Sequence, residues 1–239
     1  MLDALGRLVN ELRLVRSLKT HTPIYRVRIA AKDVVLAGPK DLGPPSRDHA
    51  KLPNRMSPAG IVMFYGALDR ETALVETFSP DIDEGCRKNV NVWVARFETL
   101  RKLHVLDLSS LPCEPSIFDS TRRHLRGTIP FLHEFVNDLK QPVMRGDKNI
   151  DYIPTQIVAE YCRHQFRTTS GASLDGIFYP TSRHGLGTAC VLFLDGHDCG
   201  VPLNGFIESV CWPRKQVLWL CDGPELLDGA NSAAWLRSV

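Results

Sequence analysis

The sequence of 239 residues lacks any apolar run long enough to cross a membrane, since a spanning helix needs about 20 predominantly apolar residues. Its first residues, 1–4, lack the basic region followed by an apolar stretch that is typical of a secretory signal. It also lacks an excess of one charge, because 29 basic and 27 acidic residues give a net charge of +2. We therefore expect neither a membrane segment nor a dedicated nucleic-acid surface.

The motifs of many common enzyme classes are also missing. The chain has no G-x-G-x-x-G after an expected strand, no Walker loop, no H-E-x-x-H and no G-x-S-x-G. Its eight histidines are scattered, and none has a cysteine or carboxylate at ligand spacing, so we expect no metal site. The seven cysteines include no C-x-x-C pair. They predict reduced thiols, most of them small buried residues, in a cytoplasmic protein.

Hydrophobic patterning predicts a single α+β domain with a mixed sheet and flanking helices. Leucine and valine at helical spacing predict an amphipathic helix over 2–18, within an N-terminal helical segment, 1–22. Strict alternation predicts a strand over 23–30, with Arg26 and Arg28 on a basic face. Further strands are expected over 61–65, 90–98, 102–108, 177–179 and 189–194, with two more over 205–221. Helices are expected over 70–77, capped by Asp69, over 115–140 with a break at 127–130, and over 154–167. The proline-rich segment 37–60 is expected to be irregular.

Several polar residues lie at unexpected places in this pattern. They are Arg26 within a strand, Arg55 in the irregular segment, Tyr65 at the end of an apolar strand, Glu76 in a helix, and Thr181 and Ser182 between a strand and a Gly-x-Gly. Each has an ordinary alternative: a solvated arginine, a core tyrosine with a satisfied hydroxyl, a solvated helical glutamate or simple turn residues. Taken singly, they indicate no more than a domain that binds an anion.

The order of these residues resembles the RES domain, a family named for an arginine, a glutamate and a serine. The most specific match is 54–76, where arginine, glycine, tyrosine and glutamate fall at the separations that the family has. The other matching segments, in the family's order, are 25–28, 152–160, 176–182 and 191–193. The resemblance implies a single catalytic domain over 23–239, with a largely antiparallel sheet like that of ADP-ribosyltransferases.

The resemblance also implies an activity. Proteins of this family degrade NAD, by hydrolysis or phosphorolysis of the nicotinamide–ribose bond, and many are toxins of toxin–antitoxin systems. NAD would then be the substrate, with no cofactor, and the candidate partners are a helix-turn-helix antitoxin protein and a second copy of the chain. Two alternatives remain open: an ADP-ribosyltransferase that modifies a protein or another macromolecule, and a non-catalytic binding domain.

The resemblance assigns catalytic roles to Arg26, Tyr65, Glu76 and Ser182. Arg26, with Arg28 and Arg55, would bind the pyrophosphate, because a guanidinium group can hold phosphate oxygens in a bidentate fork. Glu76 would hold the ribose hydroxyls and stabilise an oxocarbenium-like transition state. Tyr65 would stack on the nicotinamide or hold the ribose.

Three further positions follow from the same resemblance. Thr181 stands where the family has its serine and Ser182 follows it, so either hydroxyl would contact the ribose or the carboxamide. Gln156 matches a glutamine in a later helix of the family and is a candidate for substrate binding. Residues 56–57, Met-Ser, replace the Trp-Asn that commonly follows the second arginine of the family.

Overall fold

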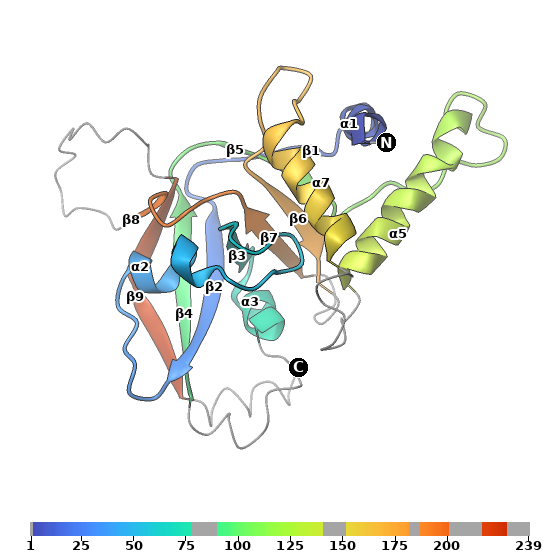
Figure 1. Cartoon of the computed structure of the whole chain (residues 1–239). Coiled ribbons are helices and arrows are strands. Elements are labelled where there is room, and N and C mark those ends of the chain that lie inside the picture. The colour runs from blue at the N-terminus through green and yellow to red at the C-terminus, as the bar shows by residue number, and fades with distance from the viewer. Residues whose placement is uncertain (1, 78–89, 141–151, 182–186, 201–216, 229–239) are drawn as a thin grey trace.

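The computed structural model describes residues 2–77, 90–140, 152–181, 187–200 and 217–228. These form a nine-stranded mixed sheet with the strand order β1-β5-β6-β7-β3-β2-β4-β9-β8 (Figure 1). The pairs β5–β6 and β8–β9 are parallel, and the other pairs are antiparallel. The predicted α+β class with a mixed, largely antiparallel sheet is therefore confirmed.

The elements follow one another along the chain as alternating groups of strands and helices. The strands are β1 (Val15–Leu18), β2 (Pro23–Ala31), β3 (Phe64–Ala67), β4 (Val90–Thr99), β5 (Leu103–Asp107), β6 (Gly176–Pro180), β7 (Thr188–Leu192), β8 (Cys199–Gly200) and β9 (Leu218–Asp228). The α-helices are α1 (Leu2–Glu11), α2 (Pro39–Leu42), α3 (Arg70–Thr77), α5 (Thr128–Lys140) and α7 (Ile153–His164), and the 3₁₀ turns are Arg47–His49 and Arg123–Arg126. Among the described residues, no helix has the length and apolar character needed to span a membrane.

The prediction of one helix over 2–18 is wrong beyond residue 11. The helix ends at Glu11, and Arg13 follows with a φ of 53° in the left-handed region. The Leu14 amide donates to the Val9 carbonyl at 3.0 Å, which is the closing bond of a Schellman cap. Leu14 is buried, and β1 then pairs with β5 at the edge of the sheet. The apolar spacing of this stretch therefore serves two elements joined by a cap.

Other helices and strands begin at residues that differ from the predicted ones, for physical reasons. Residues 115–122 are not helical, and Pro130 lies in the first turn of α5, where the missing amide hydrogen breaks no helical bond. The predicted strand 61–65 is shifted to β3, because pairing with β7 begins only at Phe64. Segment 37–60 contains α2 and a 3₁₀ turn and is otherwise irregular. Most of the two strands predicted over 205–221 lies outside the described residues.

The sheet divides the apolar core between its two faces. Ile177 of β6 and Val191 of β7 pack on the face that α1, α5 and α7 cover, whereas their neighbours Phe178 and Leu192 pack with Phe64 on the other face. This alternation follows from the pleat of the strands, which directs successive side chains to opposite faces. Side chains from one strand therefore reach both sides of the sheet.

An opening in the sheet positions the candidate site. β2 pairs with β4 along its whole length, but it pairs with β3 only at Tyr25 and Ala67. At this point the backbones approach so closely that a Cβ on Gly66 would lie 2.8 Å from the Tyr25 carbonyl oxygen, so only glycine fits. Beyond it the strands separate, beside Arg26 and Tyr65.

Candidate functional site

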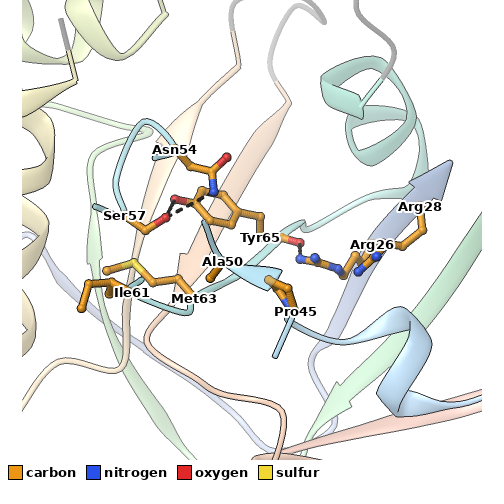
Figure 2. Close-up of a pocket in the computed structure, with 9 residues that line it drawn as sticks. All are labelled: Arg26, Arg28, Pro45, Ala50, Asn54, Ser57, Ile61, Met63 and Tyr65. Carbon is orange, nitrogen blue, oxygen red and sulfur yellow. Dashed lines mark hydrogen bonds between the residues drawn. The ribbon is translucent and has the colours of Figure 1, made fainter. Parts of the chain in front are cut away.

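A pocket of about 340 Å³ lies where β2 and β3 separate, between the sheet and the irregular segment before β3 (Figure 2). Its volume falls within the range of about 300–1,000 Å³ that is typical of small-molecule sites. It combines two guanidinium groups, three uncharged polar side chains and an apolar wall. The lining residues are Arg26, Arg28, Pro45, Ala50, Asn54, Ser57, Ile61, Met63 and Tyr65.

Arg26 is the most constrained charge in the pocket. Its Nη1 donates to the Tyr65 carbonyl at 2.6 Å, across the opening between the strands, and its guanidinium carbon lies 5.0 Å from the centre of the Phe64 ring. Burial, and then the nearby charge of Arg28, lower the Arg26 pKa from 12.5 to about 10, so the group stays cationic at neutral pH. Its buried Nε has no hydrogen-bond partner in the described part of the chain.

Arg28 follows Arg26 on the same face of β2 and lines the same pocket. Its Nη1 donates to the Gly43 carbonyl at 3.4 Å, a long bond. Two guanidinium groups with donors to spare attract an anion with several oxygens, because each group can form a bidentate pair with phosphate. The pocket is therefore suited to a phosphate or pyrophosphate group.

Tyr65 connects the pocket to the segment before β3. Its hydroxyl lies 2.9 Å from the Ser57 Oγ, and the Asn54 side-chain amide donates to the same Oγ at 3.4 Å. Burial raises the Tyr65 pKa to about 12, although hydrogen bonds from the Ser57 side chain and the Met56 backbone oppose the rise. The phenol therefore keeps its proton throughout the physiological range of pH.

Glu76 lies in the last turn of α3, a helix that begins as the sequence predicts. Asp69 accepts hydrogen bonds at 2.7 Å from both the backbone amide and the hydroxyl of Thr72, which caps the helix. At the other end, the exposed Glu76 accepts a hydrogen bond from the hydroxyl of the buried Thr181. Strand β6 ends at residue 180, so Thr181 meets α3 directly after the strand.

The Tyr179 phenol is influenced by the Glu76 carboxylate and by Tyr65, which lines the pocket. Burial raises the Tyr179 pKa well above its ordinary value, and the negative charge of Glu76 adds to the rise. Tyr65 acts on the same phenol, as the next contribution in size. Glu76 and Tyr65 are therefore both within electrostatic reach of one phenol.

Arg26 and Glu76 approach this region from different faces of the sheet. Val27, the neighbour of Arg26, packs with Leu74 of α3, so the Arg26 side chain leaves the strand on the opposite face. It reaches Tyr65 through the opening between β2 and β3. Glu76 does not line the pocket of Figure 2, and Tyr179 is the phenol on which both Glu76 and the pocket residue Tyr65 act.

Arg55 and Gln156 contact backbone outside the pocket. The Arg55 guanidinium donates to the Asp138 carbonyl at 3.1 Å and to the Leu139 carbonyl, at the C-terminal end of α5. Carbonyls at a helix end attract a cation, so this contact stabilises the helix. Gln156 of α7 donates to the Asn54 carbonyl at 2.9 Å.

Comparison with known protein families assigns the chain to one of them. A family model described as the RES domain matches residues 23–206, which is most of the chain. The chain belongs to the RES domain family. No curated protein and no solved structure matches it, so the expected likeness to ADP-ribosyltransferases stays a prediction.

The residues that the RES resemblance singled out fall into three groups. Arg26, Arg28 and Tyr65 line one pocket, and Glu76, which does not line it, is bonded to Thr181. The third group is Arg55 and Gln156, which bind backbone carbonyls of the RES domain. Ser182 lies outside the described residues. The catalytic and substrate-binding roles of all these residues stay predictions.

Two residues of this RES domain site were not among the predicted ones. Ser57 is 1% exposed and bonded to the Tyr65 hydroxyl, a contact that the strand and helix patterns do not signal. Tyr179 faces the same side of the sheet as Tyr65, and alternation along 176–180 could have indicated this.

The described residues include potential metal ligands and several cysteine thiols. These contain no group of three or more histidine, cysteine, aspartate or glutamate side chains that could hold a metal ion. Cys162, Cys190 and Cys199 are buried free thiols, as predicted, whereas Cys113 is a free thiol at the surface. Cys86 and Cys211 lie outside the described residues.

Proposed function

We propose that this RES domain protein consumes NAD by cleaving the bond between nicotinamide and ribose. The observation that carries the proposal is the pocket between β2 and β3, in which Arg26 and Arg28 face a common space beside Tyr65. Membership of the RES domain family supports the choice of NAD among the anionic ligands that such a pocket suits. The reaction would be a hydrolysis or a phosphorolysis, with water or phosphate as the acceptor.

The two arginines would hold the pyrophosphate of NAD. Arg26 uses one side-chain hydrogen bond within the described residues and has a buried Nε without a partner, so most of its donors remain for a ligand. Because Arg26 stays cationic at neutral pH, it would form charge-assisted bonds to phosphate oxygens. The chain has no glycine-rich strand–helix turn for this task, so side chains would take the place of a helix N-terminus.

Glu76 would act on the ribose. Loss of nicotinamide gives positive charge to the ribosyl carbon, and an adjacent carboxylate stabilises this charge as it develops. The hydrogen bond from the Thr181 hydroxyl fixes the position of one oxygen of the Glu76 carboxylate. Nicotinamide leaves as a neutral ring, so the reaction requires no strong general acid.

In the cell, this activity would make the chain a toxin whose partner is a helix-turn-helix antitoxin. NAD loss is harmful to any cell that depends on it, so a partner that closes the pocket would be needed during growth. This role is supported by membership of the RES domain family.

The test is to incubate the purified protein with NAD, with and without phosphate, and to identify the products by mass spectrometry. The proposal predicts free nicotinamide together with ADP-ribose, or with its phosphate when phosphate is the acceptor. Glu76→Gln should abolish turnover while NAD still binds, and Glu71→Gln, an exposed position on the same helix, should change neither. Unchanged NAD with the wild-type protein would contradict the proposal, and a covalent adduct on added protein would show a transferase instead.

A further inference from the structure

The hydroxyl of Ser57 lies between two polar side chains that line the pocket. The Asn54 amide nitrogen can only donate, and it points at the Ser57 Oγ from 3.4 Å. The Tyr65 hydroxyl lies 2.9 Å from the same oxygen. Ser57 is 1% exposed, so its hydroxyl hydrogen needs a protein acceptor.

The direction of the bond between Ser57 and Tyr65 follows from this arrangement. Within the described residues, the Tyr65 oxygen is the acceptor within reach of the Ser57 hydroxyl hydrogen, since the Asn54 amide donates. If Tyr65 donated instead, the Ser57 hydrogen would be buried without a partner, at a cost of about 1–3 kcal/mol. This difference favours Ser57 as the donor and Tyr65 as the acceptor.

We propose that Asn54 and Ser57 form a directional relay that turns the hydroxyl hydrogen of Tyr65 into the pocket, where it donates to an acceptor oxygen of the bound dinucleotide. With its oxygen occupied by the Ser57 donor, the phenol has its own hydrogen left, and the ring lines the pocket (Figure 2). The identity of the ligand rests on the proposed function, but the direction of the relay does not. Ser57 is a positioning residue in this arrangement.

Helix α7 holds the relay in place. Gln156 donates to the carbonyls of Asn54 and Ser57, at 2.9 and 3.4 Å, and the Thr155 hydroxyl donates to the Arg55 carbonyl. Both side chains are buried in the first turn of α7. The backbone amide of Asn54 donates to the Ser57 carbonyl at 2.8 Å, which closes the 54–57 turn on itself. Gln156 therefore positions the turn that carries Ser57.

Neutron diffraction from deuterium-exchanged crystals tests the direction without any ligand. The relay predicts a deuterium on the Ser57 Oγ that points at the Tyr65 oxygen, and a second one on Tyr65 that points into the pocket. A deuterium that belongs to Tyr65 and points at Ser57 would overturn the relay, whatever the protein does to NAD.

A double-mutant cycle tests the consequence for binding, with ADP-ribose as the probe and calorimetry as the measurement. Tyr65→Phe should weaken binding about tenfold and Ser57→Ala about threefold, as expected for neutral hydrogen bonds. Because Ser57 acts through Tyr65, the double variant should bind as weakly as Tyr65→Phe alone. Ser57→Thr keeps the hydroxyl and should restore binding.

The same cycle separates the relay from a structural role and from the proposed function. If Ser57→Ala lowers affinity by the same factor in the Tyr65→Phe background, Ser57 acts on the turn and the relay is wrong. If wild-type protein cleaves NAD while Ser57→Ala keeps full affinity, the relay fails and the function stands. If wild-type protein does not bind ADP-ribose, the proposed function fails, and the neutron structure still decides the relay.

Discussion

Replacing Arg26 by methionine should weaken ligand binding strongly while it leaves the free energy of unfolding almost unchanged. Burial and Arg28 lower the Arg26 pKa from 12.5 to about 10, which corresponds to about 3 kcal/mol spent on keeping this charge in the fold. The charged hydrogen bond to the Tyr65 carbonyl contributes about 1.5–3 kcal/mol, and the contact with the Phe64 ring about 0.5–1 kcal/mol. These contributions cancel to within about 1 kcal/mol, and methionine fills a similar volume without a charge.

Two measurements on Arg26→Met check this expectation. Urea unfolding should give a free energy of unfolding within about 1 kcal/mol of the wild type, whereas affinity for ADP-ribose should fall about 10- to 100-fold, as expected for a lost charge-assisted bond. Ile24→Ala, on the same face of β2 and fully buried, should lose about 2–5 kcal/mol of stability. Arg96→Met, at an exposed arginine of β4, should change neither quantity.

A loss of several kcal/mol of stability in Arg26→Met would contradict this expectation, because Arg26 would then hold the two strands together. Unchanged stability together with unchanged affinity would contradict it as well. A loss of affinity with stability preserved identifies a charge that the fold retains for a ligand.

Three further predictions concern the helix cap, a buried thiol and the cell. Asp69→Ala should lower the free energy of unfolding by about 1 kcal/mol in urea, because it removes the cap of α3, whereas Asp33→Ala, at an exposed turn, should leave it unchanged. Burial raises the Cys162 pKa from 9.0 to about 12, so the unfolded thiol alone loses its proton as the pH rises above 9. The contribution of this thiol to the free energy of unfolding should therefore be fully present below about pH 9 and decline toward pH 12, by up to about 1.4 kcal/mol per pH unit. The free energy of unfolding should fall less steeply with pH in Cys162→Ala than in the wild type, and equal slopes for the two proteins would contradict this prediction. Expression of the wild-type chain without an antitoxin should lower cellular NAD and stop growth, and Arg26→Ala should relieve both; growth arrest at normal NAD would contradict the proposed toxin activity.

The elements that local patterns specify were predictable from the sequence. Strand β2 alternates strictly, and its expected span, 23–30, differs from the observed one by a single residue. Helix α3 was predictable because its cap, Asp69, and its first turn lie next to each other in the chain. The end of α1 was not predictable, because the spacing of apolar residues does not indicate the left-handed backbone conformation at Arg13.

The sequence named candidate residues for the site but not their arrangement in space. The resemblance to the RES domain named Arg26, Tyr65 and Glu76, yet only the sheet shows that Arg26 reaches Tyr65 through an opening between two strands. The contact between Ser57 and Tyr65 depends on the path of an irregular segment, which no periodic pattern encodes. Arg55 shows the same limit, since its carbonyl partners lie more than 80 residues away at the end of α5.

The proposed reaction requires that the arginine pocket and the Glu76 carboxylate contact the same NAD molecule. A crystal structure of the Glu76→Gln variant with NAD tests it most directly, since the bond should survive in the crystal. We expect pyrophosphate oxygens about 3 Å from the guanidinium nitrogens of Arg26 and Arg28, with the nicotinamide ribose beside position 76 and Thr181. A dinucleotide bound away from the arginines, or one whose ribose lies far from position 76, would contradict it.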